Sequence, residues 1–430
     1  MSAENDASTE PPSGAKQLLG GVATPATTKQ GRPLAMERYV LRKLLEYLGQ
    51  PPLRCVLWDG SSVTPRGVAP ESELQIRDRG ALWRLAANPE YQFPAMYVQG
   101  RVTLGDDLES VLDVVQRTRH KLDPNSFRRR LHSAVVRPHS GSLAKARDNI
   151  HSHYDLGNDF YRLWLDEQMV YTCAYFPTPE VSLEAAQIAK MDLVCRKLRL
   201  RPGERVVEAG CGWGALALHM ARNYGVKVRA FNISKSQLDW AREQAAQQQL
   251  DSVVEFVEGD YREIAGHYDA FVSVGMLEHV GWRHYPALAG VMDRCLAGTG
   301  RGLVHTIGTD RPGPLNTWIE RHIFPGAYPP SLGEMMPLFG PNGFSVVDVE
   351  NLRLHYALTL RHWRRRFDGA KDTVLTMFGQ EFVRAWRFYL VSSELAFTTG
   401  HLQLFQVLFA RKGCNKMPWS RASIYRDASF

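Results

Sequence analysis

The stretch "RVVEAGCGWGALALHMARNYG", residues 205 to 225, decides the fold class. It begins as an apolar strand and passes through Gly210, Gly212 and Gly214 into a helical run. Glycines at such a junction let the backbone pass close beneath a ligand and turn tightly into the helix. We therefore predict a strand, a ligand-binding loop and a helix in this order.

The segments that follow repeat this alternation of strand and helix. Right-handed βαβ units produce it, and such units build a mostly parallel sheet with helices on both faces. No internal repeat is present. The alternating segments are strand-like "KVRAFNIS" (227–234), helical "KSQLDWAREQAAQQQ" (235–249), strand-like "VVEFVEGD" (253–260) and "YDAFVSVG" (268–275), a helix near 283–297, and strand-like "RGLVHTIG" (301–308).

The 430 residues exceed one typical domain, and composition divides them. Residues 1–33 are rich in Ser, Thr, Pro, Gly and Ala and are predicted to be disordered. Residues 34–120 mix helical and strand-like segments, which predicts a small α+β domain. Residues 121–150 carry a dense basic run, typical of a linker or a membrane-facing segment, although a merely solvated face remains open. Residues 151–415 form the predicted catalytic domain, and 416–430 a tail.

The net charge indicates which partners the protein can bind, and the cysteines indicate the redox state of its compartment. A net charge of +7, from 52 Lys and Arg against 45 Asp and Glu, fits an anionic surface such as phospholipid or nucleic acid, or simply a solvated basic surface. No apolar run reaches the roughly 18 residues of a membrane span. With no CxxC pair and no predicted signal peptide, we expect free thiols in a reducing cytoplasm. The cysteines are Cys55, Cys173, Cys195, Cys211, Cys295 and Cys414.

The glycine loop alone does not identify its ligand, because dinucleotide enzymes and methyltransferases share such loops. Glu208 stands before the first glycine, where a carboxylate can attract a cationic amino-acid group but would repel a pyrophosphate. Asp260 and Tyr261 end the third strand, within reach of an adenine. Together these residues favour S-adenosylmethionine. The second strand ends without a carboxylate for the ribose, so Asn232 and Gln237 are predicted to supply neutral hydrogen bonds.

Four segments in order resemble the cyclopropane-fatty-acyl-phospholipid synthases and the related mycolic acid methyltransferases. The resemblance covers about residues 145–412 and implies a Rossmann-like class I S-adenosylmethionine-dependent methyltransferase domain. Residues 34–120 look like the smaller N-terminal domain of some members, which is similar to sterol-carrier lipid-binding domains. The four segments are "HYDLGNDFYRLWLDEQMVYTCAYF" (153–176), "EAGCGWG" (208–214), "VSVGMLEHVG" (272–281), and "HTIG" (305–308) with the following "WIERHIFPGAYPPS" (318–331).

The resemblance implies transfer of the sulfonium methyl to the cis double bond of a phospholipid acyl chain, followed by proton loss and closure of a cyclopropane. An alkene is a weak nucleophile, so the donor must be held close in a dry pocket. Aromatic faces can stabilise the resulting carbocation, and we assign that role individually only to Tyr171.

In that family a bound bicarbonate removes the proton, and the resemblance carries its site to five residues of this chain. His305 and Tyr356 can donate to an anion, as can a backbone amide at Cys173 or Ile307, while Glu278 accepts the bicarbonate hydroxyl. A structural pair of Glu278 and the next residue, capping the following helix, remains open. The methyl donor is expected to contact Tyr171, Thr172, Gly210, Gly212, Gln237, Asp260 and Tyr261.

Cys173, in the apolar run "MVYTCAYF" (169–176), is predicted to form one wall of this anion pocket. A nucleophilic cysteine needs a general base and a covalent step, and methylation by a sulfonium needs neither. His153 lacks a second ligand at metal spacing, and we predict no metal site.

The substrate chain sits in a bilayer, so the enzyme is expected to act in the cytoplasm as a peripheral protein on the inner face of the membrane. The basic clusters "FRRRLH" (127–132) and "RHWRRRF" (361–367) are predicted to hold anionic headgroups, with Trp363 and Phe367 at the interface. An exposed helix face is the alternative. The family suggests a homodimer, and no nucleic-acid partner is expected.

Three other readings remain. The same site yields a methyl-branched, methylene-branched or hydroxylated chain if the carbocation is quenched differently. A lipid-binding protein with a degenerate methyltransferase domain is disfavoured by the intact glycines, Glu278 and His305. An NAD-dependent oxidoreductase is disfavoured by Glu208 and by the missing acid after the second strand.

Overall fold

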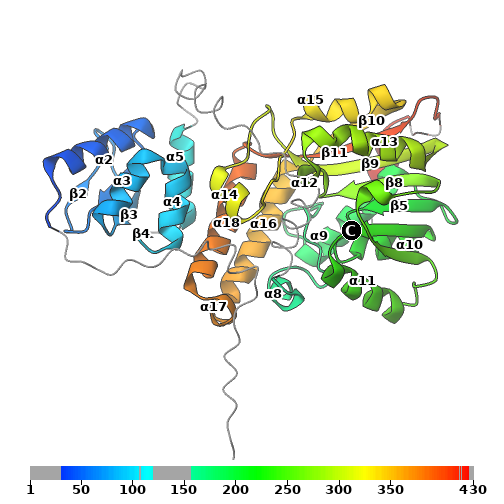
Figure 1. The fold of residues 1–430 in the computed structure, drawn as a ribbon, viewed down its shortest axis with the longest axis horizontal. Helices are drawn as coiled ribbons and strands as arrows, with labels where there is room; N and C mark the ends of the chain where they lie inside the picture. The colour runs from blue at the N-terminus through cyan, green and yellow to red at the C-terminus, as the bar shows by residue number, and fades with distance from the viewer. Residues whose placement is uncertain (1–30, 106–107, 120–155, 416, 418, 426–430) are drawn as a thin grey trace, which may run out of the picture.

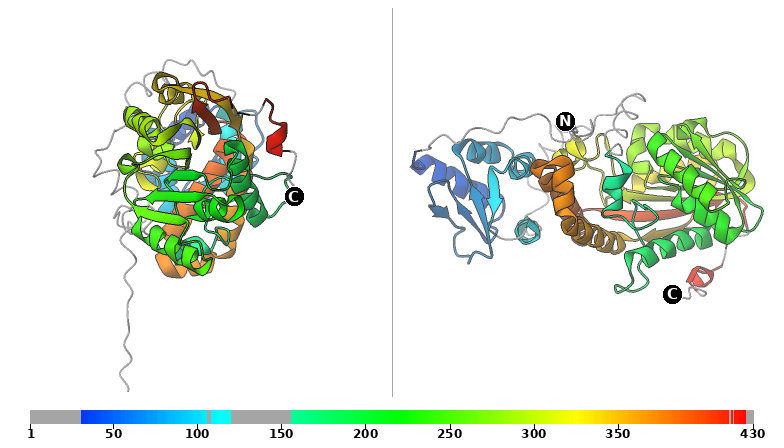
Figure 2. Two further views of the ribbon diagram at one scale, coloured as in Figure 1. Left: turned by 90° about the vertical axis from the view of Figure 1, so that its right-hand side faces the viewer. Right: turned by 90° about the horizontal axis from the view of Figure 1, so that it is seen from below.

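The computed structural model describes residues 31–105, 108–119, 156–415, 417 and 419–425. Two bodies lie side by side, and a layer of helices separates the N-terminal body from the large sheet in both Figure 1 and Figure 2. The predicted disordered segment 1–33, except its last residues, and the whole predicted linker 121–150 lie outside this description, as do His153 and "FRRRLH". The predicted domain boundaries therefore stay predictions.

The N-terminal body is a small α+β unit around a four-stranded sheet of order β2-β1-β3-β4. β1 and β3 run parallel, and β2 and β4 pair antiparallel at the two edges. Asp78 begins α3 by accepting a hydrogen bond from the amide of Ala81 at 2.8 Å. Its elements are α2 (Ala35–Tyr47), β1 (Leu53–Val56), β2 (Ser62–Val63), β3 (Ser72–Ile76), α3 (Arg79–Ala87), α4 (Pro89–Val98), β4 (Val102–Leu104) and α5 (Leu108–Arg119).

The large body has a seven-stranded sheet of order β10-β11-β9-β8-β5-β6-β7. The strands β9, β8, β5, β6 and β7 are parallel, as predicted, whereas β11 is antiparallel to both of its neighbours. Val206 packs with α9 and α10 on one face, and Val207 packs with α13 on the other. The strands are β5 (Arg205–Ala209), β6 (Lys227–Asn232), β7 (Val254–Glu258), β8 (Tyr268–Val274), β9 (Leu296–Gly308), β10 (Phe344–Asn351) and β11 (Gln403–Arg411).

Helices cover both faces of this sheet, and α16 and α18 pack against each other beside it (Figure 1). The helix predicted near 283–297 is shorter than expected: a 3₁₀ turn, Trp282–His284, precedes α13, and β9 already begins at Leu296. The helices are α8 (Asn158–Arg162), α9 (Leu183–Leu198), α10 (Ala215–Tyr224), α11 (Lys235–Gln247), α12 (Leu277–Val280), α13 (Tyr285–Cys295), α14 (Thr317–His322), α15 (Leu332–Met335), α16 (Arg353–Gly369), α17 (Lys371–Phe378), α18 (Gln380–Thr398) and α19 (Ala422–Tyr425).

The N-terminal body docks on this helical layer through α4 and α5. Phe388 of α18 lies 6.2 Å from the ring of Phe93 and 6.4 Å from that of Tyr97, measured between centroids. Arg364 of α16 forms an ion pair of 2.8 Å with Glu109 of α5. Aromatic packing and a partly buried ion pair thus join the two bodies.

The prediction that "RHWRRRF" presents Trp363 and Phe367 to a membrane is wrong. Both side chains are fully buried, because they occupy the inward face of α16. The Nε atoms of Arg361 and Arg364 donate to opposite oxygens of Glu394 at 2.7 and 3.0 Å. These two arginines therefore join α16 to α18. Arg361 is still 40% exposed and Arg365 is exposed, so the contact of the cluster with anionic headgroups stays a prediction.

Two further findings bear on the sequence predictions. None of the six cysteines forms a disulfide, which confirms the predicted free thiols, and all six lie in the described ranges. Among the helices that the structure describes, none is long and apolar enough to span a bilayer.

Candidate active site

The glycine loop lies where the parallel strands end at their carboxyl edge, between β5 and α10. The amides of Gly210 and Cys211 both donate to the carbonyl of Phe231 in β6, at 2.9 and 3.0 Å. This places the loop at the edge that binds ligands in open α/β sheets. Trp213 ties it to the segment before α9 by donating from Nε1 to Asn158 Oδ1 at 2.8 Å.

Gly212 and Gly214 have different structural roles in this loop. A Cβ atom on Gly214 would lie 2.7 Å from Phe256 and 2.8 Å from Ala241, so this glycine permits close packing. A Cβ atom on Gly212 would meet nothing within 4 Å, and its φ is +53°. The backbone at Gly212 therefore faces open space that can receive a ligand.

Glu208, the last but one residue of β5, is a buried carboxylate whose Oε2 has no hydrogen-bond partner among the described residues. Its side chain is only 2% exposed, and burial raises its pKa to about 8. A buried carboxylate without a partner is unfavourable unless a ligand compensates it. The site thus fits a cationic group such as the one that an amino-acid ligand carries.

Lys190 of α9 lies beside this carboxylate and was not predicted as a site residue. Burial lowers its pKa to about 8, and the charge of Asp166, and that of Glu208 when it is ionised, oppose this shift. Its Nζ donates to Thr172 Oγ1 at 2.9 Å. The hydroxyl of Thr172, a predicted cofactor contact, is therefore engaged by a buried cation.

Asn232 and Gln237 hold the loop together. Asn232 Nδ2 donates to Gln237 Oε1 at 2.7 Å and to the carbonyl of Gly212 at 3.1 Å. Both side chains are buried. In this structure the two predicted ribose ligands therefore bond to each other, and they fix the end of β6 against the glycine loop.

Asp260 and Tyr261 follow β7 at the same edge of the sheet. Asp260 accepts from the backbone and the guanidinium of Arg262, at 2.9 and 3.3 Å. The hydroxyl of Tyr261 is buried and has no hydrogen-bond partner in the described part of the chain. That hydroxyl is a second polar atom at this edge that a ligand can satisfy.

The run 169–176 lies across the end of β8. Gln187 Nε2 holds it by donating to the carbonyls of Val170 and Thr172, at 3.2 and 2.9 Å. Thr172 Cγ2 would lie 2.8 Å from a Cβ on Gly275, the residue after β8. Tyr171 shares a hydrogen bond of 2.9 Å with the hydroxyl of Tyr389. The run thus brings Tyr171 and Thr172, the predicted donor contacts, next to Cys173, a residue of the predicted bicarbonate site.

Cys173 is fully buried in this run. Its Sγ donates to the carbonyl of Ala174 at 3.1 Å, and burial raises the pKa of the thiol well above its ordinary value. A thiol in that state is a poor nucleophile, because the thiolate is the reactive form. The structure therefore does not favour a nucleophilic role, and the place of Cys173 in the wall of an anion pocket stays a prediction.

Glu278 lies in α12 and points to β9. Its Oε2 accepts from Thr306 Oγ1 at 2.7 Å and its Oε1 accepts from the amide of Ile307 at 3.4 Å, while burial raises its pKa. The alternative that Glu278 caps the following helix is not seen, since α13 has no side-chain cap. The Ile307 amide, predicted to face an anion, donates instead to Glu278.

His305 of β9 is 1% exposed. Its Nδ1 is 2.9 Å from Gln406 Nε2, and its Nε2 is buried with no partner among the described residues. Burial, and then the charges of Lys190 and Lys197, hold its pKa well below the ordinary value. His305 is therefore neutral, and one nitrogen is left for a ligand.

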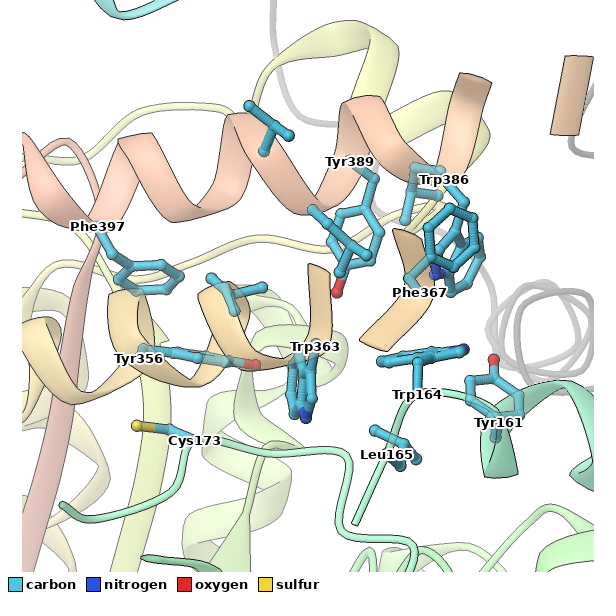
Figure 3. Close-up of a cluster of buried hydrophobic side chains, with 14 of the residues drawn as sticks. Tyr161, Trp164, Leu165, Cys173, Tyr356, Trp363, Phe367, Trp386, Tyr389 and Phe397 are labelled. Carbon is cyan, nitrogen blue, oxygen red and sulfur yellow. The ribbon is translucent and has the colours of Figure 1, made fainter. Parts of the chain in front are cut away.

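Aromatic rings from α16, α18 and the run 156–176 form the wall next to these groups (Figure 3). The ring of Tyr171 lies 5.1 Å from that of Trp164 and 5.2 Å from that of Trp363. In Figure 3 the hydroxyl end of Tyr356 points toward Trp363, and Cys173 lies beneath Tyr356. Tyr356 and Cys173, two of the five predicted bicarbonate-site residues, belong to one buried cluster.

Sequence reasoning missed Lys190, Gln187, Thr306 and Gln406. The first two lie in a helix where a polar residue ordinarily faces solvent, and Gln406 lies inside an apolar strand. Thr306 stands in the segment "HTIG" but was not singled out, and no quoted segment contains the other three. The only available signal was that a single polar residue interrupts the apolar run of β11.

A parallel sheet with an open glycine loop, a buried carboxyl with an unpartnered oxygen before it and a buried tyrosine after β7 defines an S-adenosylmethionine-dependent methyltransferase. Solved structures agree. The cyclopropane synthase MmaA2 from Mycobacterium tuberculosis superposes with a TM-score of 0.59 at 29% identity, over 62% of this chain and 98% of that one. The mycolic acid cyclopropane synthase CmaA1, complexed with SAH and CTAB, gives a TM-score of 0.59 at 31% identity, over 62% of this chain and 98% of that one.

The family model described as mycolic acid cyclopropane synthetase matches residues 142–407, and the chain belongs to this family. A probable fatty acid methyltransferase of Pseudomonas putida is 33% identical over 87% of this chain and 96% of its own length. The cyclopropane-fatty-acyl-phospholipid synthase of Escherichia coli strain K12 is 40% identical over 60% of this chain and 66% of its own length. The likeness of residues 34–120 to sterol-carrier domains stays a prediction.

Proposed function

We propose that this methyltransferase converts the cis double bond of a phospholipid acyl chain into a cyclopropane ring. One observation carries the proposal. The glycine loop lies at the same edge of the sheet as a group of buried residues: the run 169–176, Glu278 and neutral His305. The cyclopropane-fatty-acyl-phospholipid synthase of Escherichia coli is among the relatives.

In the first step the alkene attacks the methyl group of S-adenosylmethionine. A C–C bond forms from the π electrons as the C–S bond breaks, and S-adenosylhomocysteine leaves with the bond pair. Glu208 would hold the cationic amino-acid end of the donor, and the open backbone at Gly212 would admit it. A fixed donor in a water-poor site compensates for the weak nucleophilicity of an alkene.

The step leaves a carbocation, which water must not reach. The rings of Tyr171, Trp164 and Trp363 form a triangle with centroids 5.1 to 5.6 Å apart, and the Tyr171 ring is suited to face this cation. Loss of a proton from the new methyl group then frees the electron pair that closes the ring.

Bicarbonate fits the group that would take this proton, because the buried Nε2 of His305 is without a partner. When bound, bicarbonate supplies the base. His305 would donate to it from Nε2, Tyr356 from its hydroxyl, and Glu278 would accept its hydroxyl, while Cys173 and Ile307 wall the pocket. The Ile307 amide would have to give up its long hydrogen bond of 3.4 Å to Glu278.

A methyl-branched product is the second candidate. The relative aligned over 87% of this chain is named a probable fatty acid methyltransferase, and a tuberculostearic acid methyltransferase of Mycobacterium tuberculosis aligns over 88%. Both products share the first step and differ in how the cation is quenched.

The test incubates purified protein with vesicles of unsaturated phospholipid and labelled S-adenosylmethionine, then measures the mass and unsaturation of the acyl chains. A gain of one CH2 without a double bond is the expected result. A methyl- or methylene-branched chain that keeps a double bond, formed when the cation loses a proton without closing the ring, would establish the second candidate. Absence of label in the lipid would contradict both and leave the lipid-binding protein.

We further propose that the enzyme is a cytoplasmic homodimer that docks on the inner face of the membrane through anionic headgroups. The net charge of +7 supports docking, as do Trp282, 48% exposed shortly after Glu278, and Arg283 beside it. Co-sedimentation should be stronger with anionic than with neutral vesicles, and equal binding to both would contradict electrostatic docking. Light scattering should give twice the mass of one chain.

A further inference from the structure

A row of polar side chains crosses three strands behind His305. In the sheet register, His305 of β9 is opposite Gln406 of β11, and Gln406 is opposite Glu350 of β10. Residues directly opposite on neighbouring strands lie on one face of the sheet. Lys197 of α9 covers this row, and its Nζ contacts Gln406 Oε1 at 2.7 Å and the carboxylate of Glu350.

The chemistry of these groups fixes which atom donates in each bond. The ammonium of Lys197 only donates, so the oxygen of Gln406 must accept and its NH2 must face His305. An amide NH2 only donates, so Nδ1 of His305 must be the accepting nitrogen. In a neutral imidazole the other nitrogen then carries the proton, which here is the buried and unpartnered Nε2.

We infer that Gln406, oriented by Lys197, is a positioning residue that holds His305 in the neutral tautomer with its proton on Nε2. His305 then acts as a hydrogen-bond donor to the reaction's anion and does not act as the base. The inference rests on the proposed function for the identity of that anion, but the tautomer itself is a property of this chain.

The surroundings oppose the other states of the ring. A proton on Nδ1 would face the NH2 of Gln406, donor against donor. A second proton would place a cation near Lys190 and Lys197, whose charges already disfavour it. At the outer end of the row, a hydrogen bond of 2.8 Å from the hydroxyl of Tyr425 holds the carboxylate of Glu350 in place.

The experiment reads the tautomer by NMR of protein labelled with 15N-histidine. The chain has 14 histidines, and His305→Gln identifies the signal by its loss. We expect an unprotonated Nδ1 and a protonated Nε2 in the full-length protein. Gln406→Glu replaces the donor facing Nδ1 by an acceptor, and should move the proton to Nδ1 or add a second proton.

The same variant should lower kcat by about 100-fold or more, with KM for S-adenosylmethionine within about threefold of the original value. Gln406→Met removes the bond without adding charge, and should leave a mixture of tautomers with a smaller loss. Gln403→Glu is the matched control. Gln403 is buried in the same strand but bonds to Asn351 and the carbonyl of Gly400, so its change should leave the His305 signal in place.

A wild-type signal from Nδ1–H would overturn the inference, and so would a Gln406→Glu protein with a changed tautomer but an unchanged kcat. A wild-type protein that methylates no lipid would instead overturn the proposed function, because the spectrum does not depend on turnover. Circular dichroism of each variant separates these outcomes from misfolding.

Discussion

At the scale of single residues, Glu208 sets how the donor binds as pH changes. Its pKa of about 8 leaves the carboxyl mostly protonated at neutral pH in the free protein. A cationic ligand favours the ionised form, so binding should release a proton. Affinity for S-adenosylmethionine should therefore rise with pH, by up to about tenfold per pH unit, and level off above about pH 8.

Calorimetry in buffers of different ionisation enthalpy measures this proton release directly. Glu208→Gln is the control, because it keeps the shape of the side chain but cannot ionise. Protons that this variant still releases come from other groups, such as the amine of the ligand. A variant that releases as many protons as the wild type would show that Glu208 does not contact the cationic group.

Substitution of Cys173 should affect the activity much less than substitution of Glu278. Cys173→Ser keeps a small side chain that can donate to the carbonyl of Ala174, and should retain substantial activity. Glu278→Ala leaves the hydroxyl of Thr306 without its acceptor and removes the carboxylate, and should lower kcat by about 100-fold or more. The lipid methylation assay compares both. An inactive but folded Cys173→Ser protein would mean that the thiol takes part in the chemistry.

The sequence predicts site residues only where they belong to a recognisable motif. Glu208, Glu278 and His305 stand in short segments whose order is specific, so their positions at strand ends follow from the alternation of strands and helices. Lys190 and Gln406 come from a helix face and a strand interior. Their roles depend on which elements become neighbours, and a local pattern does not encode that.

At the scale of elements, the glycine loop should separate ligand binding from packing. Gly212→Ala places a methyl group in open space, at a strain cost of about 1 kcal/mol, and should weaken S-adenosylmethionine binding by about tenfold or more. Gly214→Ala forces Cβ against Phe256 and Ala241, and should lower the free energy of unfolding by about 2–4 kcal/mol.

Thermal unfolding and calorimetric titration measure the two effects on the same proteins. Gly203→Ala is the control, since Gly203 has a φ of +84°, meets nothing within 4 Å, and lies before β5 at the opposite edge of the sheet. It should show the strain without any loss of binding. Equal affinities of the Gly203 and Gly212 variants would mean that the donor does not approach this loop.

The arginine-rich helix α16 shows why an element can be misjudged from its sequence. Its composition matches a membrane-facing segment, and a helix face was only the alternative interpretation. Yet α18, far along the chain, supplies Glu394 between Arg361 and Arg364, and the aromatic side turns inward. The partner of a charged face is a long-range property, so the local pattern left both readings open.

At the scale of the whole molecule, Phe388 couples the two bodies, because it packs on Phe93 and Tyr97 of α4 and on Trp318 of α14. Phe388→Ala should cost about 3–5 kcal/mol and loosen the N-terminal body. We expect calorimetry to resolve a separate, earlier transition, and hydrogen exchange in α4 and α5 to rise ahead of the sheet.

Phe382→Ala is the matched control in the same helix. Phe382 is fully buried but packs on Phe160, Phe378 and Trp386, all within the large body. It should lower the melting temperature by a comparable amount while leaving one transition and unchanged exchange in α4. If both variants melted in one step, Phe388 would not be the contact that couples the two bodies. The ion pair of Arg364 with Glu109 would then hold them together.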